Sequence, residues 1–191
     1  AKLTLKDLTV RNGCADGLNG GGISNEGGTV NIQNSTISSN NTTGGYGGGG
    51  IYNNGTMTIR NSTISSNTSA NFGGGIFNYL NSTLNIESST ISNNRTATGG
   101  GIYNWSTMTI INSTISGNSA SINGGAIDNS GGSATLNASF VTIANNTANN
   151  QGGAIRNFAS ATFNIKNSIV AGNTVGGSPQ NCYIDASSTF T

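Results

Sequence analysis

A short phrase that returns at nearly constant spacing constrains this chain more than any other feature. It reads Gly-Gly-Gly-Ile-x-Asn or Gly-Gly-Ala-Ile-x-Asn, and its successive Ile residues are 28, 25, 26, 25 and 28 positions apart. Repeats of 20 to 50 residues are typical of solenoids, in which each repeat forms one turn of a long stack. The Ile residues of the six copies are Ile23, Ile51, Ile76, Ile102, Ile127 and Ile155.

Two further patterns recur between the phrases. One alternates Thr with apolar residues, as in Thr56-Met-Thr-Ile59, and the other reads like Ser62-Thr-Ile-Ser65 and is followed by Asn67. An alternation with a period of two is typical of half-buried strands. No segment has the apolar stripe of a helix. Gly, Asn and Ser residues between the patterns supply turns.

These patterns predict an all-β fold, a right-handed single-stranded parallel β-helix of about seven rungs with three short strands each. We expect residues 1–191 to form a single domain, because one rung cannot bury its apolar face without its neighbours. The hand follows the usual hand of parallel crossovers. The Asn of each phrase is expected to point inward and to hydrogen-bond from rung to rung. The Gly pairs are expected at a corner that needs positive φ.

Composition limits the possible functions. Only 13 residues are charged and the net charge is +1, so the chain has no basic surface for nucleic acid. It has no long apolar run for membrane insertion. No cluster has the spacing of metal ligands, and we expect no metal and no cofactor. There is no His, and we expect the six acids to be solvated surface charges, so the chain is predicted not to be an enzyme and no residue is assigned as catalytic. The acids are Asp7, Asp16, Glu26, Glu87, Asp128 and Asp185.

The variable residue inside the phrase predicts an aromatic surface patch. Tyr52, Phe77 and Tyr103 occupy this outward position in consecutive rungs, and Tyr79 and Trp105 follow close behind. Exposed aromatic patches bind sugars or proteins. A stabilising stack of side chains between rungs is the alternative, and the sequence leaves both open.

The second and third strands carry ranks of outward Thr residues, as at Thr58 and Thr63. Flat Thr ranks on a solenoid resemble those of ice-binding β-helices. Thr is also a good residue for the solvated face of a strand, which is the simpler interpretation. Asn-x-Ser/Thr sequences such as those at Asn34 and Asn94 arise by chance in a chain of this composition.

Both ends of the chain lie at the second strand of a rung, and neither carries a helix or polar cap. Open rungs expose apolar side chains and unpaired strand edges, which are a template for another chain. We therefore expect head-to-tail stacking of copies, with a piece of a longer β-helix as the alternative. The residues predicted to make the contact are Leu3, Leu5, Leu8 and Val10 at one end and Ile184 and Phe190 at the other.

The two Cys residues fit the same idea. Cys14 and Cys182 are 168 positions apart, which is about six rungs. A separation of about 30 Å at strand spacing is too long for a disulfide within one straight solenoid. Both are expected in the turn before a phrase or its equivalent, near opposite ends, and are predicted to form a disulfide between subunits. Two free thiols are the alternative.

The repeats resemble those of chlamydial polymorphic outer-membrane proteins, in which Gly-Gly-Ala-aliphatic alternates with Phe-x-x-Asn. The matching stretches are Gly124–Ile127 and Gly152–Ile155 for the first motif and Ile115–Asn118 for the second, with Ile in place of Phe. The whole chain is also similar to β-helix repeat proteins of environmental bacteria, which end like Asn167–Thr174. These resemblances imply an exported surface or extracellular protein without an assigned activity.

The sequence therefore predicts a secreted or cell-surface structural β-solenoid that associates with itself head to tail as a surface or filament subunit. An adhesin-like module that binds glycans or surfaces through the aromatic patch is the alternative. Ice binding ranks third.

Overall fold

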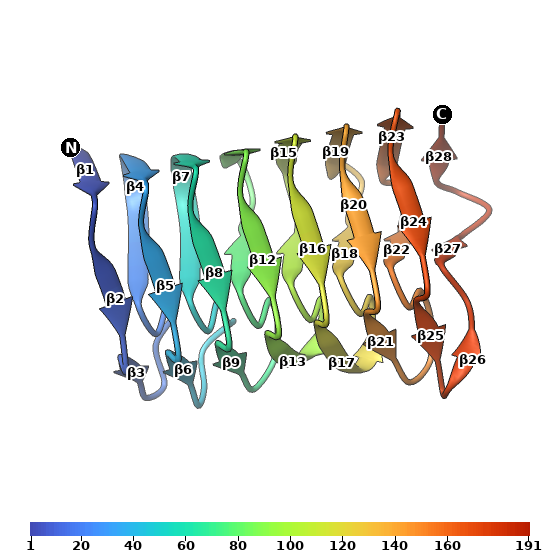
Figure 1. Cartoon of the computed structure of the whole chain (residues 1–191), viewed down its shortest axis with the longest axis horizontal. Coiled ribbons are helices and arrows are strands. Elements are labelled where there is room, and N and C mark those ends of the chain that lie inside the picture. Colours follow the sequence, from blue (N-terminus) through green and yellow to red (C-terminus); the bar gives the residue numbers. More distant parts are fainter.

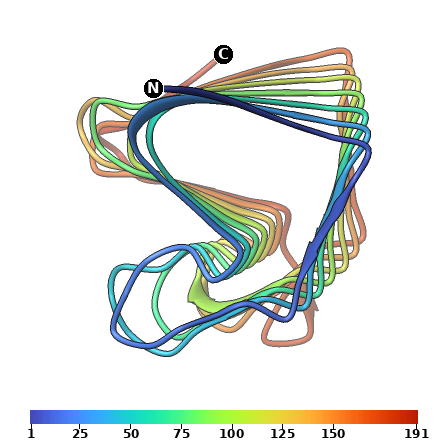
Figure 2. The same cartoon turned by 90° about the vertical axis from the view of Figure 1, so that its left-hand side faces the viewer.

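The computed structural model describes all 191 residues as coils stacked along one axis (Figure 1). It contains no helix, and therefore none long and apolar enough to cross a membrane. Seen from the N-terminal end, the chain turns clockwise as it recedes, which makes the solenoid right-handed (Figure 2). The coils pair in three sheets of 13, seven and eight strands. The prediction of a right-handed parallel β-helix of about seven coils with three strands each is confirmed.

The 13-stranded sheet holds two rows of strands, because β4 (Ile23–Gln33) and β7 (Ile51–Arg60) run through both rows. In later coils a turn separates the rows. The phrase row continues with β10 (Ile76–Asn78), β14 (Ile102–Asn104), β18 (Ile127–Ser130), β22 (Ile155–Phe158) and β27 (Cys182–Ile184). The second row adds β1 (Lys2–Lys6), β11 (Thr83–Glu87), β15 (Thr107–Ile111), β19 (Thr135–Ser139), β23 (Thr162–Lys166) and β28 (Thr189–Phe190).

The seven-stranded sheet contains the Thr-Ile-Ser pattern of each repeat. Its strands pair in parallel and in register, so that Ile64, Ile91 and Ile115 lie in one column. Its members are β2 (Thr9–Arg11), β5 (Thr36–Ser38), β8 (Thr63–Ser65), β12 (Thr90–Ser92), β16 (Thr114–Ser116), β20 (Thr142–Ala144) and β24 (Ile169–Ala171).

The eight-stranded sheet adds a short strand after the Thr-Ile-Ser strand of each coil. Its last two strands pair antiparallel, unlike every other pair. Its members are β3 (Cys14–Ala15), β6 (Asn41–Thr42), β9 (Thr68–Ser69), β13 (Arg95–Thr98), β17 (Ser119–Asn123), β21 (Thr147–Ala148), β25 (Thr174–Val175) and β26 (Ser178–Pro179).

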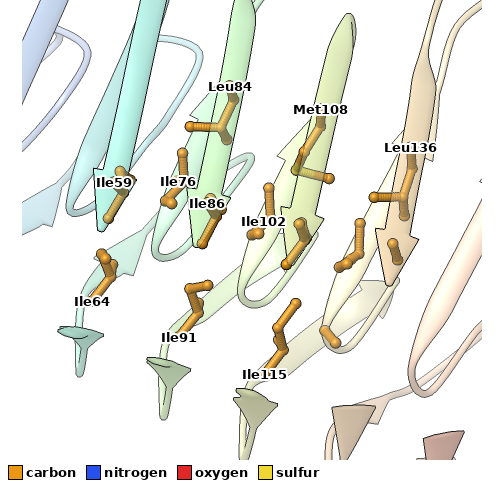
Figure 3. Packing of buried hydrophobic residues seen from close by; sticks show 14 of the residues in the cluster. Ile59, Ile64, Ile76, Leu84, Ile86, Ile91, Ile102, Met108, Ile115 and Leu136 are labelled. Carbon is orange, nitrogen blue, oxygen red and sulfur yellow. The ribbon is translucent and has the colours of Figure 1, made fainter. Parts of the chain in front are cut away.

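The core consists of columns of apolar side chains that run along the axis (Figure 3). Leu84, Met108 and Leu136 form part of one column, and each is fully buried. Each side chain contacts its equivalents in the coils on either side, so 24 buried residues join into one cluster. This continuity lets coils too small to fold alone stabilise one another.

Two ladders of buried amides accompany the apolar columns. In the predicted ladder, the Nδ2 of Asn53 donates to Asn78 and that of Asn78 donates to Asn104, both at 2.8 Å. A second ladder, not predicted from the sequence, joins Asn67 to Asn94 with an Nδ2–Oδ1 distance of 3.0 Å. Every amide donates toward the next coil, so these buried polar groups are satisfied and the ladders have a direction.

The glycines of the phrase serve two different needs. Gly73 has φ of 58°, and a Cβ built there would lie 2.2 Å from the carbonyl oxygen of Ile76. Gly74 has ordinary φ, but its Cβ would lie 2.4 Å from the carbonyl oxygen of Gly100 in the next coil. The first glycine makes the predicted corner and the second allows close approach of the backbones.

Candidate functional site

The predicted aromatic patch lies on the outer face of the phrase row, where its rings stack in consecutive coils. Tyr52, Phe77 and Tyr103 pair in register, but they are only 3%, 0% and 6% exposed. The expectation of an exposed patch is therefore wrong for these three residues. They form a second hydrophobic cluster, separate from the core inside the solenoid.

The outer cluster is buried because neighbouring segments bring further rings to it. Phe77 lies at its centre, in edge-to-face contact with Tyr52 at 5.7 Å and Tyr103 at 5.2 Å between ring centroids. Phe72, from the loop before the phrase, lies 4.7 Å from Tyr103. Figure 2 shows loops projecting beyond the phrase row at both of its ends. Edge-to-face packing of this kind stabilises aromatic clusters.

Solvent reaches the outer cluster along one border. Tyr46 is 51% exposed, and Tyr79 and Trp105 are half-buried. The ring centroids of Tyr46 and Tyr79 are 5.6 Å apart, as are those of Tyr79 and Trp105. The ring planes are tilted by 41° and 53°, so the border is a stepped row rather than a flat platform.

A buried ion pair continues the same outer column. Asp128 pairs in register with Tyr103 on one side and with Arg156 on the other. The Arg156 Nε lies 3.0 Å from Asp128 Oδ2, and the Ser130 hydroxyl donates to the other carboxylate oxygen. The guanidinium also lies 4.4 Å from the centroid of the Phe158 ring, a cation–π contact.

Asp128 is 0% exposed, so the expectation that all acids are solvated surface charges is wrong for it. Burial raises the pKa of Asp128 to about 6, although Arg156 and Ser130 oppose that rise. The signal in the sequence was opposite charge at the same phrase position in neighbouring repeats. Burial likewise raises the pKa of Tyr52 to about 12, with a smaller effect from Glu26. No group of three or more His, Cys, Asp and Glu side chains is arranged to hold a metal ion.

The residues predicted for end-to-end contact lie at the two ends of the stack. Leu3 and Leu5 pair with Val30 and Ile32 of the core columns, and Phe190 pairs with Phe163. Their columns have no further coil on the other side. Leu3 is accordingly 49% exposed and Phe190 51% exposed. Among the others, Leu5, Leu8 and Val10 are half-buried and Ile184 is 37% exposed.

The C-terminal coil closes some of its edges. Strand β26 folds back antiparallel on β25 and carries Pro179, which has no backbone N–H to offer to a further strand. Asn181 ends the second amide ladder by accepting from Asn173 at 3.0 Å. Ile184 takes the place of Asn in the first ladder, opposite Asn157. Both ladders therefore end within the chain.

Cys14 and Cys182 are free thiols in different sheets. Cys14 lies in β3 of the eight-stranded sheet and is exposed. Cys182 was expected in a turn, but it lies in β27, where it pairs with Ile155 and packs against the core. Here the chain lacks the Gly-Gly corner and Cys replaces the phrase Ile. Burial raises the pKa of its thiol.

The Thr ranks face outward in register, as Thr63 does against Thr90. They are mostly half-buried by their neighbours. The Asn-x-Ser/Thr sequences divide into two groups: Asn67 and Asn94 are buried ladder residues, whereas Asn34 and Asn61 lie in exposed turns.

Comparison with protein families gives one match. The model of the Chlamydia polymorphic membrane protein repeat matches residues 112–130 and 140–157. Each matched segment ends in a strand of the phrase row, β18 or β22. The chain is a parallel β-helix repeat protein that resembles these chlamydial repeats. No curated protein and no solved structure matches the chain.

Proposed function

We propose that this chain is a structural β-solenoid segment of a cell-surface or extracellular protein. The match to a repeat of chlamydial polymorphic membrane proteins supports this surface role. A rod of stacked coils suits a scaffold or adhesive role.

The finer part of the proposal is that copies stack end to end. The observation that carries it is the exposure of core-column side chains, Leu3 at one end and Phe190 at the other. In every other coil these columns are covered by another coil. Stacking in register places β1 of the next copy over β28, the last strand of the second row, and such a contact does not close on itself, so it extends into a filament.

The eight-stranded sheet limits how this junction forms. Because β26 covers β25, the next copy cannot pair directly with β25. Stacking in register also places Cys14 over the column of Thr174, whereas Cys182 lies under the column of Ile23. The register therefore argues against the disulfide between subunits, and the junction is non-covalent.

Sedimentation velocity and negative-stain electron microscopy of the chain over a range of concentrations test the proposal. We expect rods that lengthen with concentration and are insensitive to reductant. A double variant, Leu3→Lys with Phe190→Lys, is expected to give single rods that keep the β-sheet circular dichroism of the unmodified chain. Ile122→Lys is the matched control, because Ile122 is 45% exposed but lies on β17 in mid-stack. Single rods of the unmodified chain at every concentration would refute end-to-end stacking.

An adhesin-like role is the second candidate, favoured by the stepped row of Tyr46, Tyr79 and Trp105. Partly exposed rings in successive coils suit stacking on sugar rings. A glycan array tests it: a hit should weaken in Tyr46→Ala, and should persist in Phe140→Ala, whose ring is exposed elsewhere. Absence of any hit, or hits indifferent to Tyr46, would remove this candidate.

A further inference from the structure

One edge of the solenoid changes character along its length. At the corner between the second row and the seven-stranded sheet, the early coils are polar. There Lys6 pairs with Asp7 at 3.8 Å and Arg60 pairs with Glu87 at 2.8 Å. The last three coils instead place large apolar side chains in solvent at this corner. These are Ile111, Phe140 and Ile169, which are 37%, 58% and 62% exposed.

Phe140 stands at a position where the backbone disfavours it. Its φ is 55°, in the left-handed region that Asn and Asp tolerate best. The equivalent residues of the other six coils are Asp7, Asn34, Asn61, Ser88, Asn112 and Asn167, with φ between 48° and 55°. Because Phe140 is strained and adds little to the core, folding alone does not account for it. Strained, exposed residues of this kind concentrate at functional contacts.

A groove that suits an aromatic ring lies beside Phe140. It has a volume of about 470 Å³ and is lined by residues of β15, β19 and β23 and by Thr191, with Ile111 and Lys166 among them. Ile111 offers an apolar wall, and the stem of Lys166 offers another below its ammonium group. An ammonium beside an aromatic face is attractive. Asn164 donates a hydrogen bond to Asn137 at 2.8 Å, so some of the hydrogen-bonding groups that line the groove are already paired.

We propose that two copies of the chain associate side by side about a two-fold axis, each inserting Phe140 into the groove of the other. The ring and the groove lie next to each other on one chain, which is the arrangement a self-complementary interface needs. Antiparallel packing brings the two apolar halves of the edge together. It keeps Lys6, Asp7, Arg60 and Glu87 outside the contact, so Lys166 of the groove is the one charged side chain of this edge that the contact includes.

This side-by-side contact differs from end-to-end stacking, because it uses the flank of the last coils and only Thr191 of its groove lies at the open end. It is also a small interface, centred on three apolar side chains in each copy. A weak, concentration-dependent dimer is therefore expected.

Sedimentation equilibrium in the Leu3→Lys, Phe190→Lys background tests the dimer without interference from end-to-end stacking. The decisive variant is Phe140→Asn, because Asn fits the left-handed backbone here. It should fold at least as stably by thermal melting, yet weaken dimerisation at least tenfold. Lys166→Glu should weaken dimerisation to a smaller extent. Ile122→Asn, on the flank of β17, should leave dimerisation unchanged.

Three results would overturn the proposal. The first is a monomer at all concentrations in that background. The second is a dimer that Phe140→Asn leaves intact. The third is a glycan-array signal that Phe140→Asn abolishes while the mass stays that of a monomer, which would assign the groove to a carbohydrate.

Discussion

The two faces of the phrase row follow different rules. On the inner face every coil from the first phrase to the last repeats Ile and Asn, and each side chain contacts a copy of itself above and below. On the outer face the same strands carry Ser24, Tyr52, Phe77, Tyr103, Asp128 and Arg156 in succession. This face does not repeat, yet its middle positions are as deeply buried as the core.

The difference shows that burial and repetition are separate requirements. A ladder of identical amides works only if each coil supplies the same donor and acceptor, so the inner face tolerates no exception within the stack. An aromatic cluster or an ion pair needs only compatible neighbours, so the outer face varies. Because it varies, the outer face is where coils acquire individual properties.

The most demanding test of this comparison uses adjacent residues on opposite faces of β10. Ile76 and Phe77 are both 0% exposed. If the outer cluster is a true second core, Phe77→Ala should lower the free energy of unfolding by about 3–5 kcal/mol, at least as much as the 2–5 kcal/mol expected for Ile76→Ala. Urea denaturation followed by circular dichroism measures both. Tyr46→Ala, at the exposed border, is the control, and a Phe77→Ala loss no larger than that of Tyr46→Ala would contradict a second core.

Interrupting an amide ladder should cost somewhat less. Asn78→Ala removes the acceptor of Asn53 and the donor to Asn104, while Asn53 keeps its bonds to the carbonyls of Gly55 and Thr83. Leaving buried groups partly unsatisfied predicts a loss of about 2–4 kcal/mol. Asn149→Ala, at an exposed position with ordinary φ, serves as the control in the same denaturation assay. Equal losses for the two variants would show that the ladder adds nothing.

The ion pair of Asp128 and Arg156 predicts that the free energy of unfolding depends on pH through a residue of the outer face. The pKa of Asp128 is about 6 in the folded chain against an ordinary 3.8, so the folded state holds this proton more tightly than the unfolded state. Its contribution to stability is therefore full below about pH 4 and is lost as pH rises past 6, by up to about 3 kcal/mol.

Unfolding free energies measured between pH 4 and 7 check this sign. Asp128→Asn should reduce the change in the free energy of unfolding between pH 4 and 7. Glu87→Gln, at an exposed carboxylate, should leave that change in place. Parallel pH profiles for Asp128→Asn and the unmodified chain would mean that the carboxyl does not titrate in this range.

The smallest expected losses of stability come from substitutions of glycines in the repeated phrase. Gly99 has φ of 72°, whereas Gly101 has ordinary φ and its position carries Ala126 and Ala154 in later coils. Gly99→Ala should cost about 1–3 kcal/mol and Gly101→Ala less than about 1 kcal/mol. Differential scanning calorimetry of the two variants ranks them, and the reverse order would contradict the assigned roles of the glycines.

The same comparison explains what the sequence could predict. Inner residues such as Ile76 and Asn78 recur at fixed spacing, so their strands, register and direction follow from the pattern. The second ladder was also visible in principle, because Asn67 and Asn94 recur as regularly as the phrase Asn. The pattern alone does not assign these Asn residues to a ladder, because an Asn that ends a strand recurs at the same spacing.

The sequence places the outer-face residues in one column but does not show that they are buried. The register put Tyr52, Phe77 and Tyr103 in one column, but their burial depends on rings such as Phe72 from a loop of irregular length. The position of Cys182 was missed for a related reason. The last coil lacks the phrase, so no pattern marked Cys182 as the residue in the Ile column.

The arrangement of strands across the solenoid axis has a mechanical consequence. The two termini lie at opposite ends of the stack (Figure 1). A force that pulls them apart acts along the hydrogen bonds between coils, which then bear the load one coil at a time rather than together in shear. Under tension such a rod is expected to release its coils in sequence and to lengthen in steps.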